Sequence, residues 1–465
     1  MAQENHKVTG DSPEEAEEAG FPLTHKFVSS VVKALKDNDL AQVRVLLEPL
    51  HAADLADLLG LVSADQRRDL IEVLRQDLDP DLLAELDPAV RDDVIEQLEP
   101  SEVAAAVSEM ETDEAVYVLE DLEEDERQAV LENIPAEERA AVEVSLSYPE
   151  DSAGRLMQRD LIAVPAFWTV GQTIDYMRET ADLPDEFYEI FVVDPKHHPI
   201  GTIPLNRLLR AKRPVIVSEI MTGEPHLLRA DTDQEEVAYL FKQYGLMSAG
   251  VVDEDNRLIG VIMVDDVVDV IEEEAEEDIL RLGGVSDADF NESIFEITRT
   301  RFIWLMVNLA TAVLASTVIA QFGATIQQMV ALAVLMPIVA SMGGNAGTQA
   351  LTVAVRNLAT RELTWTNAMR AISKEVIVGT INGGILAIVI GFVGAIWFDN
   401  VSLGLVLGAA MIINILVAAL AGILVPLGLE RAGIDPAVAS GVFVTTITDV
   451  VGFLAFLGLA AWFLL

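Results

Sequence analysis

The chain has 465 residues, of which 76 are acidic and 30 are basic, so its formal net charge is −46. A surface this negative repels phosphate backbones and anionic lipid headgroups, which excludes nucleic acid as an expected partner. The absence of cysteine excludes disulfides, thiolate metal sites and a cysteine nucleophile. The acidity is uneven, because residues 299–465 hold 7 basic and 6 acidic side chains, a net of +1, which leaves −47 for residues 1–298.

Residues 1–27 are predicted to be a disordered, acidic N-terminus. The first 25 residues lack the basic start and apolar run of a signal peptide, so we expect the acidic two-thirds of the chain to stay in the cytosol. Lysine is scarce, with 8 Lys against 22 Arg. Scarce lysine and abundant carboxylates favour a halophilic protein, whose self-repulsion is screened in a cytosol of high ionic strength. A surface that binds calcium or magnesium is the alternative, and the two interpretations are compatible.

Short amphipathic helices are predicted for residues 28–147. Apolar side chains recur there with helical spacing, for example at Leu55 and Leu59. Proline, often after aspartate as at Asp79-Pro80, separates these segments. The pattern predicts an all-α superhelical domain built from helical hairpins. Nothing in it suggests catalysis, and we expect His51 to be a surface or capping residue.

Residues 148–264 are predicted to alternate strands and helices, and this segment repeats itself. Val192-Val193-Asp194 and Ile200-Gly201-Thr202-Ile203 recur 59 residues later as Val251-Val252-Asp253 and Ile259-Gly260-Val261-Ile262. Each copy is predicted to be a strand, a polar turn and a strand, with a helix before and after it. A tandem β-α-β-β-α pair of this size resembles two CBS (cystathionine-β-synthase-type) domains, which regulate their host proteins and often bind nucleotides.

Residues 265–298 are predicted to be an acidic connecting helix and a linker to the membrane. Val267, Ile271, Ala275 and Ile279 recur every four residues and form one apolar face, while most other positions are carboxylates. Acids at i and i+4 repel each other unless a cation neutralises them. A solvated charged face is the usual explanation for such a run. Because this run directly precedes the first membrane span, we expect it to couple cation binding to gating.

Five apolar segments are long enough to cross a bilayer, which takes about 20 residues. They are Ile303–Phe322, Val330–Leu351, Val376–Phe398, Leu403–Leu427 and Pro436–Leu464, within a membrane domain of residues 299–465. Basic residues precede the first span and lie between spans two and three and spans four and five, at Arg299, Arg301, Arg356, Arg361, Arg370, Lys374 and Arg431. This asymmetry predicts a multi-pass protein of the cytoplasmic membrane with a cytosolic N-terminus and an external C-terminus.

Asp449 lies about halfway along the fifth span. A carboxylate at that depth costs several kcal/mol unless it faces water or a cation, so an ion pathway is the leading interpretation. The predicted spans contain no basic residue that could pair with it. A protonated or side-chain-paired structural aspartate is the alternative. A single such residue per chain suggests a symmetric dimer that places two carboxylates at one axis.

The second span combines Pro337 with the small and polar stretch Ser341–Gln349, which contains three glycines. We expect these residues to break helical continuity and to let backbones approach closely. Its neutral oxygens, which could hydrogen-bond the water shell of an ion, belong to Asn345, Thr348 and Gln349. Small residues that only pack helices are the alternative.

With these segments in place, the chain from about residue 28 to its end resembles the MgtE family of magnesium channels. The stretches that carry the resemblance are Tyr148–Gly154, Asp231–Val237, Val264–Val267, Gly343–Gly347 and the pair Asp435-Pro436, fourteen residues before Asp449. The resemblance implies a multidomain fold with an all-α superhelical N domain, an α/β tandem CBS pair and an α-helical transmembrane domain with five spans.

The resemblance also implies a homodimer whose second and fifth spans line a pore for hydrated Mg²⁺, an ion that sheds its water reluctantly. The implied pore residues are Asp449, Asn345, Gly343, Gly344, Thr445 and Thr448. Regulatory Mg²⁺ sites would involve Asp233, Glu235, Asp266, Glu274, Glu277, Asp278, Asp435 and Asp113. Two of these have structural alternatives, because Thr232 with Glu235 could form a capping box and Asp435 could cap a helix that begins at Pro436.

The chain also departs from the family pattern. Some members bind ATP in the CBS pair through an aromatic residue and a ribose-contacting aspartate, where this chain has Glu189 and Arg207. A further aromatic position is Leu246 here, so we expect weak ATP binding or none. Gly441 and Val442 replace an Asn-Pro pair, so we expect the pore entrance to differ in detail.

The leading hypothesis is a Mg²⁺-selective channel that is gated by cytosolic Mg²⁺ and carries passive influx. The alternative is a CBS-regulated secondary transporter of another divalent cation, such as Mn²⁺ or Co²⁺, or of an anion. An anion carrier would need basic groups at mid-membrane, where we find only Asp449. An enzyme is not expected, because the spans hold neither histidine nor paired carboxylates at one depth.

Overall fold

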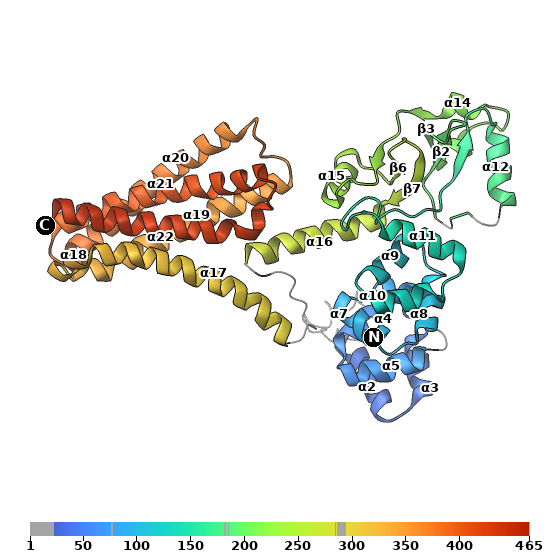
Figure 1. Ribbon diagram of the computed structural model, residues 1–465, viewed down its shortest axis with the longest axis horizontal. Helices are drawn as coiled ribbons and strands as arrows, with labels where there is room; N and C mark the ends of the chain where they lie inside the picture. Colours follow the sequence, from blue (N-terminus) through green and yellow to red (C-terminus); the bar gives the residue numbers. More distant parts are fainter. Residues whose placement is uncertain are drawn as a thin grey trace, which may run out of the picture. The chain divides into compact units, whose positions relative to one another are not determined.

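The computed structural model describes residues 23–75, 78–180, 183–184, 186–283, 285 and 294–464. The chain divides into two compact units, one that ends at Ile271 and one that begins at Glu272. The first holds a helical domain followed by two small sheets with helices, and the second is a bundle of long helices (Figure 1). The predicted multidomain fold is therefore confirmed. Most of the predicted disordered N-terminus lies outside the described residues.

Short helices follow one another through the N domain of the first unit. They are α2 (His25–Lys36), α3 (Leu40–Leu47), α4 (Ala52–Leu61), α5 (Ala64–Leu74), α6 (Asp81–Ala84), α7 (Pro88–Ile95), α8 (Pro100–Val107), α9 (Thr112–Glu120), α10 (Glu124–Leu131) and α11 (Ala136–Leu146). Their apolar faces share one core that runs from Val31 to Val142. His51 caps α4 through Nδ1, which accepts a hydrogen bond from the Ala53 N–H at 3.4 Å, so the predicted capping role is confirmed.

Two sheets of similar design make up the CBS pair. One has the strand order β1 (Ala163–Pro165), β2 (Glu189–Val193), β3 (Pro199–Pro204) and β4 (Thr222–Gly223), and the other β5 (Leu227–Arg229), β6 (Ser248–Val252) and β7 (Leu258–Met263). The helices around them are α12 (Val170–Glu179), α13 (Leu205–Arg210), α14 (Val217–Ile220) and α15 (Gln234–Tyr244).

The sequence repeat is reproduced in the register of these strands. Val192 is paired with Gly201 and, 59 residues later, Val251 with Gly260. In both copies the pairing of the antiparallel strands shifts directly after that valine. One detail of the prediction is wrong, because Thr232 does not cap the next helix. Asp233 is the N-cap of α15 and accepts a hydrogen bond from the Glu235 N–H at 2.9 Å.

Helix α16 (Val264–Leu282) is the acidic connecting helix, and its last part belongs to the second unit. The linker residues 286–293 lie outside the described residues. The membrane helices that follow are α17 (Ile294–Gln321), α19 (Ala331–Ala359), α20 (Ala368–Trp397), α21 (Val401–Arg431) and α22 (Pro436–Phe463), with the short α18 (Gly323–Gln328) after the first. Within the described residues, five helices are long and apolar enough to cross a membrane.

Helix α21 lies at the centre of this bundle, where it packs against α19, α20 and α22. Glycines permit the close approach. A Cβ added at Gly404 of α21 would overlap the Gly391 carbonyl oxygen of α20 and would lie 2.8 Å from the Ala395 Cβ. The second span differs from the prediction, because α19 is one continuous helix that includes Pro337 and the glycines. A bilayer offers no water for freed backbone groups, which favours a helix that accommodates proline over one that breaks.

The close approach at Gly404 can be tested by adding one methyl group. We expect Gly404→Ala to lower the free energy of unfolding of the membrane domain by ~1–3 kcal/mol, because the backbone of α20 must move to avoid the new Cβ. The measurement is denaturant unfolding of the purified protein in detergent. Gly428→Ala on the same helix is the control, because its added Cβ meets no atom within 4 Å. Equal stability of the two variants would contradict the packing described here.

Candidate functional site

The five membrane helices share a polar feature at mid-length. Each has an Asn or Asp within two residues of its midpoint: Asn308 in α17, Asn345 in α19, Asn382 in α20, Asn414 in α21 and Asp449 in α22. Amides and carboxylates at the bilayer centre are costly, so they face water, an ion or another polar group. The membrane domain therefore carries a polar layer at mid-depth, and Asp449 is the charged member of that layer.

The predicted pore residues divide between exposed and buried positions. Asn345 on α19 and Thr445 on α22 are exposed, and Asp449, one turn after Thr445 on the same face, is half-buried. Thr448 is fully buried, and its hydroxyl donates to the Thr445 carbonyl oxygen at 2.9 Å. A Cβ added at Gly347 would lie only 2.5 Å from a methyl group of Val444, which shows how closely α19 and α22 pack beside Thr448.

The two glycines of the predicted pore stretch also differ in their surroundings. Gly343 is buried, and a Cβ there would overlap the Asn414 side chain. Gly344 has open space where a Cβ would extend. Gly343 is therefore required by packing, whereas Gly344 lies beside the accessible face that carries Asn345.

A groove of about 740 Å³ lies between α19 and α20, with Ile415 and Ala419 of α21 also lining it. Its polar lining consists of Asn345, Thr348 and Gln349 from α19 and Glu375 and Asn382 from α20. The two asparagines have the same mid-helix depth, and Glu375 lies two turns nearer the start of α20. Sequence reasoning missed Glu375 and Asn382. The spacing of seven residues between them, which places both on one helix face, was the available signal.

Asn414 was also missed in the sequence, where it is the single amide in a span of apolar residues. The structure buries it completely. Its Nδ2 donates to the Val339 carbonyl oxygen of α19 at 2.8 Å. Among the described residues, no hydrogen-bond donor reaches its Oδ1. Asn414 therefore links α21 to α19 inside the bundle.

In the first unit, two of the predicted regulatory acids influence each other. Asp113 of α9 is 7% exposed, and its two carboxylate oxygens have no hydrogen-bond partner among the described residues. Burial raises the pKa of Asp113 well above its usual range, and the charge of Asp266 adds to this rise. Burial beside Asp265 raises the pKa of Asp266 to about 7, although this carboxylate accepts a hydrogen bond from the Met263 N–H at 3.2 Å. Protein groups alone therefore compensate poorly for the burial and mutual repulsion of the Asp113 and Asp266 carboxylates.

In the second unit, Arg281 holds two other predicted regulatory acids. Its guanidinium forms ion pairs with Glu277 on α16 and with Asp435, the N-cap of α22. Asp435 also accepts a hydrogen bond from the Ala437 N–H at 2.7 Å, which confirms the predicted cap before Pro436. Burial, together with the charges of Asp435 and Glu274, raises the pKa of Asp278 to about 6. The end of α16 is therefore an acidic cluster with one tethered cation.

The end of α16 also contacts the helices of the candidate pore. Leu282 packs against an apolar cluster formed by Leu351 and Val355 of α19, Ala421 of α21 and Ala437 and Val444 of α22. The backbone approaches as well, because a Cβ added at Gly441 would lie 3.9 Å from the Leu282 carbonyl oxygen. A movement of this helix end would therefore directly change its contacts with α19 and α22.

The remaining predicted metal ligands, Asp233 and Glu235, are exposed at the start of α15. Within the described part of the chain, no three acids or histidines converge in the manner of ligands to one ion.

In other family members, three positions of the CBS pair are expected to contact ATP, and here they are Glu189, Arg207 and Leu246. All three side chains already have protein partners. Glu189 accepts a hydrogen bond from the Ser248 hydroxyl at 3.2 Å. Arg207 donates to the Ile220 carbonyl oxygen at 3.1 Å, and Leu246 packs on the core of the second sheet. The side chains of Glu189, Arg207 and Leu246 therefore all contact other residues of the CBS pair.

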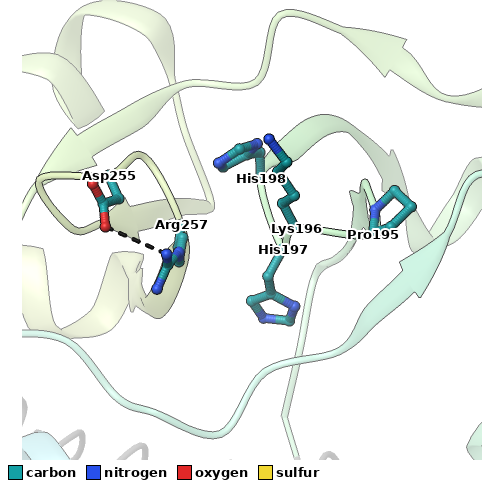
Figure 2. A pocket seen from close by; sticks show the side chains of 6 residues that line it. All are labelled: Pro195, Lys196, His197, His198, Asp255 and Arg257. Carbon is teal, nitrogen blue, oxygen red and sulfur yellow. Dashed lines mark ion pairs between the residues drawn. The ribbon is translucent and has the colours of Figure 1, made fainter.

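A separate hollow of about 730 Å³ lies between the two β-hairpin turns of the CBS pair (Figure 2). Its lining is Pro195, Lys196, His197, His198, Asp255 and Arg257. The basic groups are partly neutralised, because His198 Nδ1 lies 3.0 Å from Asp194 and Arg257 lies 3.4 Å from Asp255. The Leu258 N–H donates to the His197 carbonyl oxygen at 3.0 Å, which joins the two turns. Glu189, Arg207 and Leu246 do not line this hollow.

Comparison with known proteins connects these features to one family. The model of the MgtE family, described as a divalent cation transporter, matches residues 336–459. The model of the MgtE intracellular N domain matches residues 50–151, and that of the CBS domain matches residues 153–213 and 217–273. The matches follow the order of the domains described above.

Individual proteins give the same result. The chain is similar to the magnesium transporter MgtE of Thermus thermophilus, at 37% identity over 322 residues, which is 68% of this chain and 71% of that protein. It is also similar to the magnesium transporter MgtE of Enterococcus faecalis, at 33% identity over 319 residues, or 69% and 70% of the two chains. A crystal structure of the cytosolic domain of the Mg²⁺ channel MgtE in complex with ATP is 32% identical, with a TM-score of 0.49, and covers 52% of this chain and 99% of its own.

The helical domain, both CBS repeats and most of the membrane helices are thus matched by family models in the same order, and two relatives are 33% and 37% identical over more than two thirds of the chain. The chain belongs to the MgtE family of divalent cation transporters.

Proposed function

We propose that the protein is a Mg²⁺-selective channel that works as a homodimer in the cytoplasmic membrane. The observation that carries this proposal is Asp449, a half-buried carboxylate at the midpoint of α22 with Thr445 beside it on the same face. Mg²⁺ dehydrates reluctantly, so a pore can select it as a hydrated ion through carboxylate and neutral oxygens. Two copies would place two Asp449 carboxylates near one symmetry axis. Similarity to the magnesium transporters of Thermus thermophilus and Enterococcus faecalis supports the choice of ion.

The groove between α19 and α20 extends this proposed pathway. Asn345 and Asn382 supply amide groups at the depth of Asp449, and Glu375 supplies a carboxylate towards the end where the basic residues predict the cytosol. With the N-terminus inside, the membrane potential drives influx. For a divalent ion it contributes ~4.6 kcal/mol per 100 mV, twice the value for one elementary charge.

Cytosolic Mg²⁺ would close the channel through the acidic clusters. Asp113 and Asp266 form the site that fits an ion best, because the buried oxygens of Asp113 lack any donor among the described residues. A bound Mg²⁺ would supply the missing positive charge there. At the end of α16, Arg281 already neutralises Glu277 and Asp435, so Asp278, whose pKa is raised by burial and by neighbouring acids, is the acid proposed to contact an ion, with Glu274 in the same proposed set. Several weak sites acting together would give a steep response. Asp233 and Glu235 complete the proposed regulatory set.

Nucleotide regulation is not part of this proposal. Glu189 and Arg207 replace the residues that other family members use for ATP, and both have partners within the CBS pair. We infer that ATP binds this chain weakly or not at all.

The pore assignment is tested at Asp449. We expect Asp449→Asn to abolish Mg²⁺ flux into liposomes while the protein still folds, because the substitution removes the charged group at mid-depth. Asp399→Asn is a matched control, since Asp399 lies in the short connection between α20 and α21 with a φ of 49°, a conformation that asparagine also tolerates. Normal Mg²⁺ uptake by the Asp449 variant would remove the basis of the proposed pore.

The regulatory site is tested at Asp113. In EDTA, Asp113→Leu should raise the free energy of unfolding by about 1–3 kcal/mol, because it removes buried oxygens that lack partners. Mg²⁺ should stabilise the wild-type protein more than this variant, which keeps only the other proposed sites. Thermal unfolding of the full chain with and without Mg²⁺ measures both effects. Asp65→Asn, which removes an exposed carboxylate, should respond to Mg²⁺ like the wild type. A destabilised Asp113 variant that Mg²⁺ protects as strongly as the wild type would refute the assignment.

The tethered cation is tested at Arg281. Arg281→Gln leaves Glu277 and Asp435 without their positive partner, so hydrogen exchange at the end of α16 in EDTA should accelerate about tenfold. Added Mg²⁺ should restore the protection by replacing the lost charge. Arg257→Gln, which removes an exposed ion pair in the CBS domains, is the control. If exchange at the end of α16 is unchanged by Arg281→Gln, the ion pairs of Arg281 do not hold this helix end.

A further inference from the structure

Asn414 occupies a junction of three membrane helices. It belongs to α21, is fully buried and donates through Nδ2 to the Val339 carbonyl oxygen of α19. On the third helix, α22, a Cβ added at Gly452 would lie 2.7 Å from Nδ2 and 3.3 Å from Oδ1. The amide thus fills the space left by two glycines, Gly343 on α19 and Gly452 on α22.

These two glycines are close in sequence to the proposed filter residues. Gly343 precedes Asn345 by two positions, and Gly452 follows Asp449 by three positions, less than one helical turn. Because Asn414 contacts both glycines, its side chain sets how closely these parts of α19 and α22 can approach α21. Any change in its size or hydrogen bonding would move the backbone that carries Asn345 and Asp449.

Stability alone does not account for an amide at this position. The Oδ1 of Asn414 is buried and lacks a donor among the described residues, which is unfavourable in a membrane protein interior. A leucine has nearly the same shape and would bury no unpaired oxygen. Replacing a partly unsatisfied polar group with an apolar one of similar shape is often neutral or stabilising. The amide therefore requires an explanation other than packing energy.

We propose that Asn414 is a positioning residue for the ion filter, which fixes α19 and α22 at the spacing that hydrated Mg²⁺ requires. The single hydrogen bond to Val339 sets the height of α19 against α21, and the contacts with the two glycines set the separation of the helices. The role rests on the proposed function, because it acts through Asn345 and Asp449 and does not require contact between Asn414 and the ion.

The first test separates selectivity from stability. Asn414→Leu removes the hydrogen bond while keeping the shape of the side chain. We expect Mg²⁺ flux into liposomes to fall about tenfold and its preference over Ca²⁺ and K⁺ to weaken, with thermal stability unchanged or raised. A purely structural role predicts lower stability with normal selectivity. Wild-type flux and selectivity in this variant would overturn the proposal.

The second test uses compensation and remains informative if Asn414→Leu does not fold. Gly343→Ala should reduce selective flux, because its Cβ overlaps the Asn414 amide. Asn414→Ala alone should also reduce it, because a gap opens between the helices. The double variant Gly343→Ala with Asn414→Ala should recover much of the lost flux, because the new methyl group occupies the vacated space. Gly428→Ala on α21 is the control and should behave like the wild type.

The outcomes distinguish this proposal from the proposed function. If Asp449→Asn abolishes flux while the double variant is no better than its single parents, the pore assignment stands and the role of Asn414 is refuted. If Asp449→Asn conducts normally, the pore itself lies elsewhere. If Asp449→Asn is inactive and the double variant recovers selective flux, both are supported.

Discussion

A polar group placed in hydrocarbon must find water, an ion or a polar partner, and the membrane domain is organised around this constraint. Its five long helices each carry an asparagine or aspartate at mid-length, and the structure treats them differently. Asn414 is turned inward to a carbonyl oxygen, Asn345 and Asn382 line a groove, and Asp449 stays half-exposed. The apolar bulk of the helices places these groups at one depth, and the glycines allow the helices to approach closely enough to hold them there.

Carboxylates in the acidic part of the chain also need partners, and there the basic residues that could neutralise them are too few. Where a basic residue is available, it neutralises the acids, as Arg281 does for Glu277 and Asp435. Where none is available, as at Asp113, burial raises the carboxyl pKa and the oxygens remain without donors among the described residues. A protein with 76 acids and 30 basic residues cannot pair them all internally. We therefore expect soluble cations to neutralise part of the remaining negative charge.

Much of this architecture could be predicted from the sequence. The sequence repeat at Val192 and Val251 is reproduced in the register of the strands. Asp435 caps the fifth membrane helix, as the proline that follows it indicated. Such features depend on local patterns, which the sequence records directly. The continuous course of α19 through Pro337 was not predicted, because a proline's local preference competes with the demand of the bilayer for a complete helix. Contacts such as those of Asn414 and Arg281 depend on which helices meet, and a single sequence does not specify that.

The short connection between α20 and α21 has a consequence for how the membrane domain is assembled. Only Phe398, Asp399 and Asn400 separate the two helices, and glycines bring their backbones together over several turns. Contacts between neighbours in sequence form early, because little chain entropy is lost in closing so short a loop. We expect this hairpin to leave the translocation machinery as a paired unit and to provide the surface on which α19 and then α22 dock. We expect α22, the helix that carries Asp449, to be the last to be placed.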